Sequence, residues 1–429
     1  MNRVCLCLPT NRACSATIAA LHDEAAYAAR RHGADVNLLI LDSSDAHTRA
    51  EHARTVAALP PAGNVTVHHL DEAAQRAFLR RTTERAGLPE PDRLLHLMLP
   101  PAVSYGACTN RAFLLAAALG CASVHRRDSD STYQVHAGEP VFPVHHELPY
   151  LGRPAAEAGA GGLHTDLDPA LRGRPVSLAG ASFIGELSVD IGEIRRLDEG
   201  IYHDVVGLWA PGDWSEERRR ELVEESFTGA GTAPFTGDRS TLTVVDPMRV
   251  DMCNIAFDRA VYERVPLPPA TDTIGSDYFL LHLVHDAGLP GILHNRHIQN
   301  FHTPERRTDT GFPAYQRRFV KFLLSMLYFH HVYDRMAAEG AGLLDERHRV
   351  RADRIVEFLR GSTGVDRTEN VWRLDRVDTA YRKLGGRYAE FADRLAVERE
   401  RLLDEAQSDI EDYAYLVEAW PALVEAAQA

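Results

Sequence analysis

Apolar runs alternate with segments of helical periodicity along the first part of the chain. Each short apolar run predicts a strand, and each periodic segment predicts a helix. Strands that alternate with helices are joined by right-handed crossovers, which produces a mostly parallel sheet flanked by helices. The pattern therefore predicts an α/β fold. The strands and helices expected are, in order, 3–8, 13–31, 36–41, 46–59, 65–69 and 71–86.

The next strand leads into a pair of carboxylates. A helix is expected over 109–119, ended by Gly120, and a buried strand follows at 121–125. The loop after it carries Asp128 and Asp130, whose side chains project to the same side of an extended backbone. Carboxylates suit Mg²⁺ or Mn²⁺, which also share the phosphate oxygens of a substrate. The rival interpretation is an ordinary solvated loop, because Asp-x-Asp is common.

The pattern weakens in the middle of the chain and becomes helical toward its end. A strand is expected near 182–188 and an acidic helix at 216–225. Beyond residue 310 helices dominate, so the chain divides into a domain at 1–310 and a helical C-terminal region at 311–429, which we expect to serve packing or homo-oligomerisation. The helices expected there are 315–336, 345–359, 374–402 and one from 404 to the end.

Composition and missing motifs exclude several classes of function. The 429 residues carry a formal net charge of −14, which argues against non-specific nucleic-acid binding. No apolar run has the length of a membrane span and no signal sequence begins the chain, so a cytoplasmic protein is expected. Residues 9–14, after the first strand, lack the glycine pattern of dinucleotide-binding proteins, and no phosphate-binding P-loop occurs. A redox enzyme and a P-loop kinase are therefore disfavoured.

Candidate binding residues gather where the predicted strands end. In parallel sheets, ligands bind at the carboxyl ends of strands. The segment Pro9-Thr10-Asn11, the strand-end Asp42 and the segment Asp128-Ser129-Asp130 all fall at such ends. Turn formation alone is the rival explanation for Asn11 and Asp42.

Four segments, in order, resemble a nucleotide-sugar-dependent glycosyltransferase of the A fold (GT-A, family-2-like), over about residues 3–307. Leu8-Pro9-Thr10-Asn11-Arg12 resembles the loop that holds the nucleoside, and Asp42 the acidic residue beside it. Asn110-Arg111 followed by Asp128-Ser129-Asp130 resembles the metal-binding D-x-D motif and its preceding helix. The stretch 253–259, then Gly275-Ser276-Asp277-Tyr278, then Asn300-Phe301-His302 resembles the acceptor side, the acidic motif and the late histidine. The chain departs from the family pattern at three places. Asn110-Arg111 stands where the family usually has Arg-Asn, Ser276 stands where it has glutamate, and Arg127 stands where it has an apolar residue.

The resemblance implies a metal-dependent glycosyltransferase that moves a sugar from a nucleoside-diphosphate sugar, with UDP as the expected nucleotide, to a soluble acceptor such as a small molecule or peptide. It assigns Mn²⁺ or Mg²⁺ to Asp128, Asp130 and His302. In an inverting enzyme Asp277 would take the proton of the acceptor, and in a retaining enzyme it would position the acceptor. The residues it implies for donor binding are Pro9, Thr10, Asn11, Arg12, Asp42, Asn110, Arg111 and Arg306.

Each of these assignments has an alternative. Asp277 could be a helix N-cap, His302 a structural histidine and Arg306 a surface charge. A sugar-phosphate nucleotidyltransferase is the second enzyme class, although its glycine-rich loop after the first strand is missing. A non-catalytic nucleotide-sugar-binding or interaction protein on the same scaffold is the third interpretation.

Overall fold

The computed structural model describes residues 2–160, 163–301, 308 and 311–429. Within these ranges, nine strands form one sheet in the order β3-β2-β1-β4-β12-β9-β13-β11-β8. The first four strands in this order run parallel, and β12 is antiparallel to both of its neighbours. The predicted α/β fold with a mostly parallel sheet is therefore confirmed. The strands are β1 Arg3–Thr10, β2 Asp35–Asp42, β3 Val65–Asp71, β4 Ser123–Arg127, β8 His164–Thr165, β9 Leu178–Gly180, β11 Ser240–Thr243, β12 Asn254–Asp258 and β13 Gly291–His294.

The alternation of side chains along β1 explains why helices cover both faces of the sheet. Val4 and Leu6 pack with Ile18 of α1 (Ser15–His32) on one face. Cys5 belongs to the core on the other face, together with Phe113 of α5 (Tyr105–Ala118). Both faces of β1 are therefore buried, which is why it reads as a continuous apolar run. Further helices of this part are α2 Ala46–Ala57, α3 Glu72–Ala86, α4 Pro91–Met98 and α6 Val144–Glu147.

A small second sheet links the loop after β4 to the chain near residue 300. Its order is β10-β14-β5, with bounds Phe183–Gly185, Ile298–Asn300 and Ser131–Tyr133. The remaining short elements are β6 Val135–His136, β7 Glu139–Pro140, α7 Ala155–Ala160, α8 Gly192–Leu197, α9 Glu199–Val206, α10 Glu216–Glu225, α11 Arg259–Tyr262 and α12 Phe279–Asp286.

Four C-terminal helices follow, and two of the predicted boundaries among them are wrong. The helices are α13 Gly311–Glu339, α14 Ala352–Ser362, α15 Thr368–Leu384 and α16 Gly386–Gln428. The helix expected over 374–402 is two helices, because Gly385 and Gly386 both take positive φ values, of 74° and 51°. Helix α16 then continues through residues 402–404, where a break was expected.

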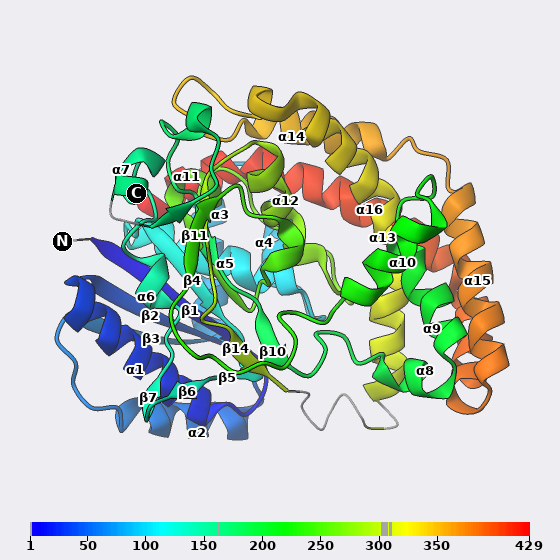
Figure 1. The fold of residues 1–429 in the computed structure, drawn as a ribbon, viewed down its shortest axis with the longest axis horizontal. Coiled ribbons are helices and arrows are strands. Elements are labelled where there is room, and N and C mark those ends of the chain that lie inside the picture. The colour runs from blue at the N-terminus through cyan, green and yellow to red at the C-terminus, as the bar shows by residue number, and fades with distance from the viewer. Residues whose placement is uncertain (1, 161–162, 302–307, 309–310) are drawn as a thin grey trace.

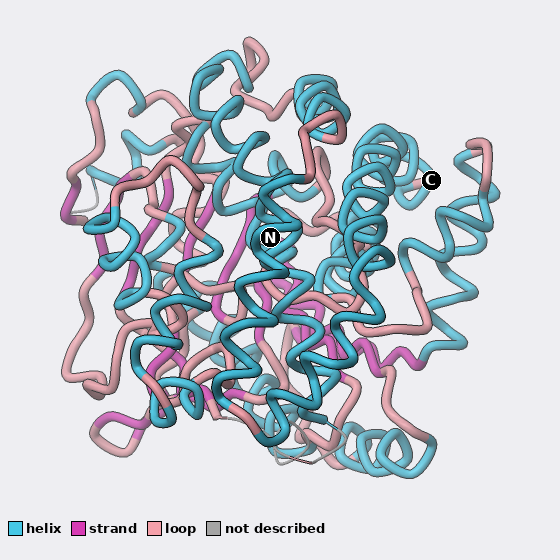
Figure 2. The backbone as a smooth tube through the Cα atoms, turned by 90° about the vertical axis from the view of Figure 1, so that its right-hand side faces the viewer, coloured by secondary structure: helices cyan, strands magenta, loops and turns pink. Residues whose placement is uncertain are grey.

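The C-terminal helices share a core with the rest of the chain. The indole N–H of Trp420 donates to the carbonyl of Tyr262 at 2.9 Å, and both side chains are fully buried. Figure 1 shows the sheet at the left, with α13, α15 and α8–α10 at the right and α16 behind. In the view of Figure 2, helices cover the side that faces the reader and strands lie behind them. No helix in the described part of the chain combines the length and apolar character needed to span a bilayer.

Candidate active site

Two cavities meet at the carboxyl ends of the parallel strands, within the part of the chain that the structure describes. One has a volume of about 450 Å³ and the other about 180 Å³. Both are lined by Tyr105, Arg126, Asp128, Asp130 and Tyr315. The two carboxylates predicted from the sequence therefore lie at the junction between a larger and a smaller cavity.

The larger cavity is lined by the ends of β1 and β2 and by the loop before α5. The backbone N–H of Ser43 donates to the carbonyl of Thr10 at 2.8 Å, which holds the ends of β1 and β2 together. Arg318, from α13, also lines this cavity, and its Nε is buried without a hydrogen-bond partner among the described residues. The residues proposed for donor binding that line the cavity are Pro9, Thr10, Asn11, Arg12 and Arg111.

Arg126, on β4, joins two carboxylates at the junction. Its Nε donates to Oδ1 of Asp128 at 3.0 Å, and its Nη1 donates to Oδ2 of Asp277 at 2.6 Å. The arginine is buried, so these ion pairs are shielded from solvent. Asp277 lies inside a short 3-10 turn whose N-cap is Gly275, so the N-cap interpretation of Asp277 is wrong.

Asp130 is held from the side of the larger cavity. Nη1 of Arg12 donates to its Oδ2 at 2.9 Å. The backbone N–H of Phe301 donates to the backbone carbonyl of Asp130 at 3.3 Å, which brings the strand β14 beside the loop. His302 and Arg306, predicted as a metal ligand and a phosphate contact, lie outside the described residues.

The carboxylates at the junction repel one another. The pKa of Asp128 is raised to about 6, chiefly by burial; Arg126 opposes the rise, whereas Asp130, Asp277 and Asp251 contribute to it. A carboxyl group in a cavity whose pKa is raised by burial and by neighbouring carboxylates is a candidate for a functional site.

The donor set at the junction fits a divalent cation. Asp128 and Asp130 supply carboxylate oxygens, which Mg²⁺ and Mn²⁺ prefer. Oδ2 of Asp128 has no hydrogen-bond partner among the described residues, so it is available as a ligand. The mutual repulsion that raises the pKa of Asp128 is also what a bound cation would relieve.

Two of the predicted donor-binding residues face away from the cavities. Asp42 is fully buried and accepts hydrogen bonds from His52 and His69, each at 2.8 Å, and from the backbone of Ser44 at 2.9 Å. Asn110 is equally buried, and its amide makes a reciprocal pair of hydrogen bonds with the backbone of Leu267. Both side chains organise the scaffold, and their placement corrects the expectation that they face the donor.

Sequence reasoning missed Arg126, Arg318 and Asp251. Along β4, alternate side chains face opposite sides, so Arg126 faces the junction while Arg127 faces the buried carboxylates Glu24 and Glu147. The two adjacent arginines in the sequence were a signal for this arrangement. Arg318 carried no local signal, because its contribution depends on how α13 packs.

Two other groups of metal-type side chains occur in the described part of the chain. One is Asp42, His52 and His69, and the other is His145, His146 and Asp238. In the second, Asp238 also accepts two hydrogen bonds from Arg296, at 2.6 and 2.9 Å. These hydrogen-bonded networks lie away from the junction, since none of their residues lines either cavity.

Fold and site together define an α/β protein with an acidic site between two cavities. The chain belongs to a family of unknown function, DUF6271, whose model matches residues 2–429. No curated protein matches the chain.

Solved structures with a similar fold include three at 13–18% identity. "Mannosyltransferase PcManGT from Pyrobaculum calidifontis in complex with GDP-Man and Mn2+" has 13% identity over 97% of this chain and 87% of that chain, with a TM-score of 0.36. Glucosyl-3-phosphoglycerate synthase from Mycobacterium tuberculosis, in complex with Mn²⁺, UDP-glucose and phosphoglyceric acid, has 17% identity over 76% and 79%, with a TM-score of 0.32. A structure titled "Crystal Structure of a Mycobacterial Protein" has 18% identity over 76% and 74%, with a TM-score of 0.34.

Proposed function

We propose that this chain is a metal-dependent glycosyltransferase that moves a sugar from a nucleoside-diphosphate sugar to an acceptor. The observation that carries the proposal is the meeting of two cavities at Asp128 and Asp130, with Asp277 lining the smaller cavity beside them. A transferase needs such a junction, because the hydroxyl oxygen of the acceptor must reach the anomeric carbon of the bound donor.

The larger cavity is the donor site. Its loop at residues 9–12, beside Ser43, would receive the nucleoside, and UDP is the first nucleotide to test. Arg12 and Arg318, with Arg111 deeper in the wall, give this cavity a positive side that suits a diphosphate. Arg306 is proposed as a further phosphate contact.

Asp128 and Asp130 would hold Mn²⁺ or Mg²⁺, with His302 proposed as a third ligand. When bound, the cation would supply positive charge that stabilises the departing nucleoside diphosphate. Arg126 keeps Asp128 oriented toward the junction through its hydrogen bond to Oδ1.

Asp277 is proposed as the general base. Arg126 holds its Oδ2, and its Oδ1 has no hydrogen-bond partner among the described residues. In the transfer, the acceptor oxygen forms a bond to the anomeric carbon as its proton passes to Asp277. The bond from that carbon to the diphosphate oxygen breaks, and its electron pair leaves with the nucleoside diphosphate. This assignment requires inversion; retention would instead leave Asp277 to orient the acceptor, and the anomer of the product separates the two.

Thermal stability in the presence of UDP, GDP, CDP and dTDP, each with and without Mn²⁺, tests the proposal. A ligand that binds only the folded state stabilises it by about 2.7 kcal/mol at about 100 times its dissociation constant. We expect a metal-dependent shift with one nucleotide. No shift with any nucleotide, with or without metal, would contradict the donor assignment.

A further inference from the structure

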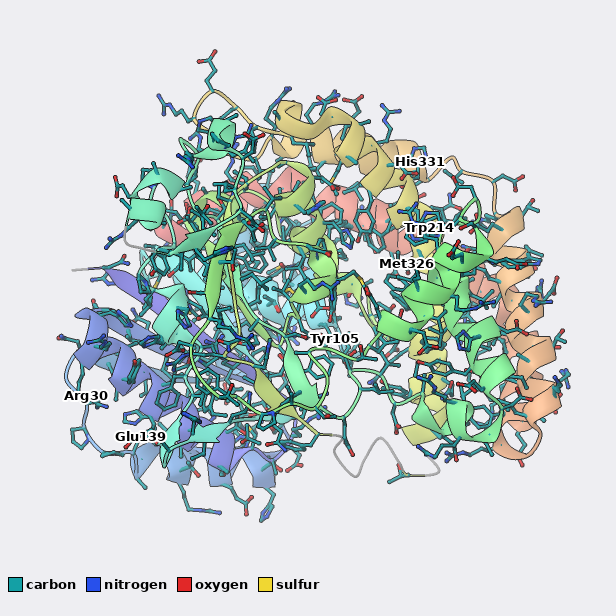
Figure 3. All side chains as sticks on the ribbon, viewed as in Figure 1. Arg30, Tyr105, Glu139, Trp214, Met326 and His331 are labelled. Atoms are coloured by element: carbon teal, nitrogen blue, oxygen red, sulfur yellow. The ribbon has the colours of Figure 1, made fainter. Side chains whose placement is uncertain are left out.

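The smaller cavity has a wall built mainly from apolar side chains. These come from three distant parts of the chain: the segment around β10, the stretch from 209 to 252, and α13. Figure 3 labels Tyr105 of α5, near the centre of the view, and Met326 of α13, to its right; both residues line this cavity. The large apolar side chains of this wall include Phe183, Trp209, Phe227, Met248, Phe322 and Met326.

Three aromatic rings in this wall pack against one another. The ring centroid of Trp209 lies 5.9 Å from that of Phe322 and 6.2 Å from that of Phe227. The indole N–H of Trp209 donates to the hydroxyl of Ser226 at 3.0 Å, which fixes the orientation of the indole. Clusters of this kind favour a further aromatic ring, because edges and faces of rings attract one another.

The backbone at this wall is held in a strained conformation. Phe227 has a φ of +64°, which a bulky residue rarely adopts. Its carbonyl accepts a hydrogen bond from the N–H of Ser188 at 3.0 Å, so the conformation is held by a contact from another segment. Gly275, next to the turn that carries Asp277, approaches the wall so closely that a Cβ there would lie 2.8 Å from the ring of Phe322. The wall therefore lies directly against the turn that carries the proposed base.

The volume of the cavity suits one ring. At about 180 Å³ it is comparable to cavities of roughly 150 Å³ that take up benzene. A flat six-membered ring with a short hydroxyl-bearing arm fills such a space, whereas a sugar ring would leave its several hydroxyl groups facing apolar walls without partners.

Carboxylates surround the end of the cavity that opens to the junction. Besides Asp128 and Asp277, Asp251 lines this end and accepts hydrogen bonds from the hydroxyl of Tyr278 and the backbone N–H of Cys253, which are neutral donors. Arg126 is already paired with two of these carboxylates. An anionic acceptor would therefore meet repulsion here.

We propose that the acceptor is an aromatic alcohol or phenol without negative charge, whose ring occupies the smaller cavity and whose hydroxyl points toward Asp277. The inference rests on the proposed glycosyl transfer, because the junction with the donor site makes this cavity the acceptor site. Transfer would join the sugar to the hydroxyl oxygen of this acceptor, and the hydroxyl proton would pass to Asp277.

Quenching of tryptophan fluorescence by 4-nitrobenzyl alcohol tests this inference on the full chain. We expect saturable quenching, lost in Trp209→Phe and retained in Trp372→Phe, because Trp372 is exposed on α15 and lines neither cavity. We expect 4-nitrobenzoate, which has the same ring with a negative charge, to bind at least about tenfold more weakly. Equal or tighter binding of 4-nitrobenzoate would overturn the inference.

A matched pair of variants tests whether the alcohol binds in the smaller cavity. Met248→Glu introduces a carboxylate into the apolar wall, at a half-buried residue, and we expect it to weaken binding of the alcohol at least about tenfold. Leu197→Glu makes the same kind of change at a residue of α8 that is 57% exposed and outside the cavity, and should leave binding unchanged. Unchanged binding in Met248→Glu would overturn the inference.

Nucleoside-diphosphate binding, measured on the same protein, shows whether the acceptor class or the proposed glycosyl transfer itself is wrong. A metal-dependent nucleotide shift without binding of the alcohol overturns the acceptor class and leaves the glycosyltransferase proposal standing. Binding of the alcohol without any nucleotide shift overturns the proposed function, and the acceptor assignment with it.

Discussion

The substitution Asp128→Asn should stabilise the metal-free protein while abolishing its proposed activity. Burial, together with the neighbouring carboxylates Asp130, Asp277 and Asp251, raises the pKa of Asp128 from 3.8 to about 6 against the opposing effect of Arg126. A raised pKa means that the folded protein favours the protonated form of the carboxyl group. Ionisation of Asp128 therefore destabilises the folded protein at neutral pH, and asparagine, which does not ionise, removes this destabilisation.

The magnitude follows from the shift. A difference of about 2 pKa units corresponds to about 3 kcal/mol, at 1.36 kcal/mol per unit, for a fully desolvated group. The side chain of Asp128 is 26% exposed, and solvent screening reduces the expected gain in the free energy of unfolding to about 1–2 kcal/mol. The gain should be absent below pH 3.8, grow as the pH rises toward 6, and stay constant above it, because only the wild-type side chain ionises over that interval.

Urea unfolding of wild type and Asp128→Asn from pH 3.5 to 8, in the presence of a chelator, measures this difference. Asp42→Asn is the control of opposite sign. Burial acts to raise the pKa of Asp42, but hydrogen bonds from His69, Ser44 and His52 outweigh it and lower that pKa. Asp42→Asn should therefore destabilise at neutral pH, and its effect should stay constant down to about pH 4, because the pKa of Asp42 in the folded protein lies below its unfolded value of 3.8. An Asp128→Asn protein that is less stable than wild type at pH 7, or a difference independent of pH, would refute the reasoning.

Three further substitutions test other parts of the account. Arg127→Met leaves the buried carboxylates of Glu24 and Glu147 without their arginine, and urea unfolding should show a free energy of unfolding lower by about 3–5 kcal/mol. A loss below 1 kcal/mol would contradict the importance of this cluster. Asp277→Asn should lower kcat for glycosyl transfer by about 100- to 10,000-fold with nucleotide affinity unchanged, and a normal kcat would exclude Asp277 as the base. Arg318→Gln should weaken nucleoside-diphosphate binding by about 10- to 100-fold, the equivalent of one charge-assisted hydrogen bond, and should leave the melting temperature without ligand unchanged. Equal affinity of the variant and wild type in calorimetry would remove Arg318 from the donor site.

Much of the scaffold was predictable because buried strands and helices produce characteristic hydrophobic patterns in the local sequence. The strands β1 and β2 are buried on both faces, and each appears as a continuous apolar run that the structure confirms. The helix predicted at 216–225 agrees with α10, whose Ser215 caps its first turn. Since parallel strands end at one edge of a sheet, the convergence of residues 9–12 and the Asp128–Asp130 pair also followed from the pattern.

What the sequence could not reveal depends on contacts between distant segments. Asp42 lies at a strand end, as predicted, but His52 and His69 bind its carboxylate away from the cavity, and no local pattern records that competition. Helix α13 was expected to serve packing, yet its residues Tyr315 and Phe322 line the cavities. Amphipathic periodicity identifies the apolar face of a helix without stating what that face covers.

Calorimetric titration of UDP in the presence of Mn²⁺ into wild type and the double variant Asp128→Asn/Asp130→Asn tests the central claim most directly. The chain offers a matched control in Asp166→Asn/Asp168→Asn, a second Asp-x-Asp pair that is exposed and lines neither cavity. If UDP gives no signal, GDP, CDP and dTDP are titrated in the same way. The account predicts that the control binds like wild type and that the Asp128/Asp130 variant loses the Mn²⁺-dependent part of the affinity. Equal, Mn²⁺-dependent binding by all three proteins would contradict the assignment of the metal and donor site to this junction.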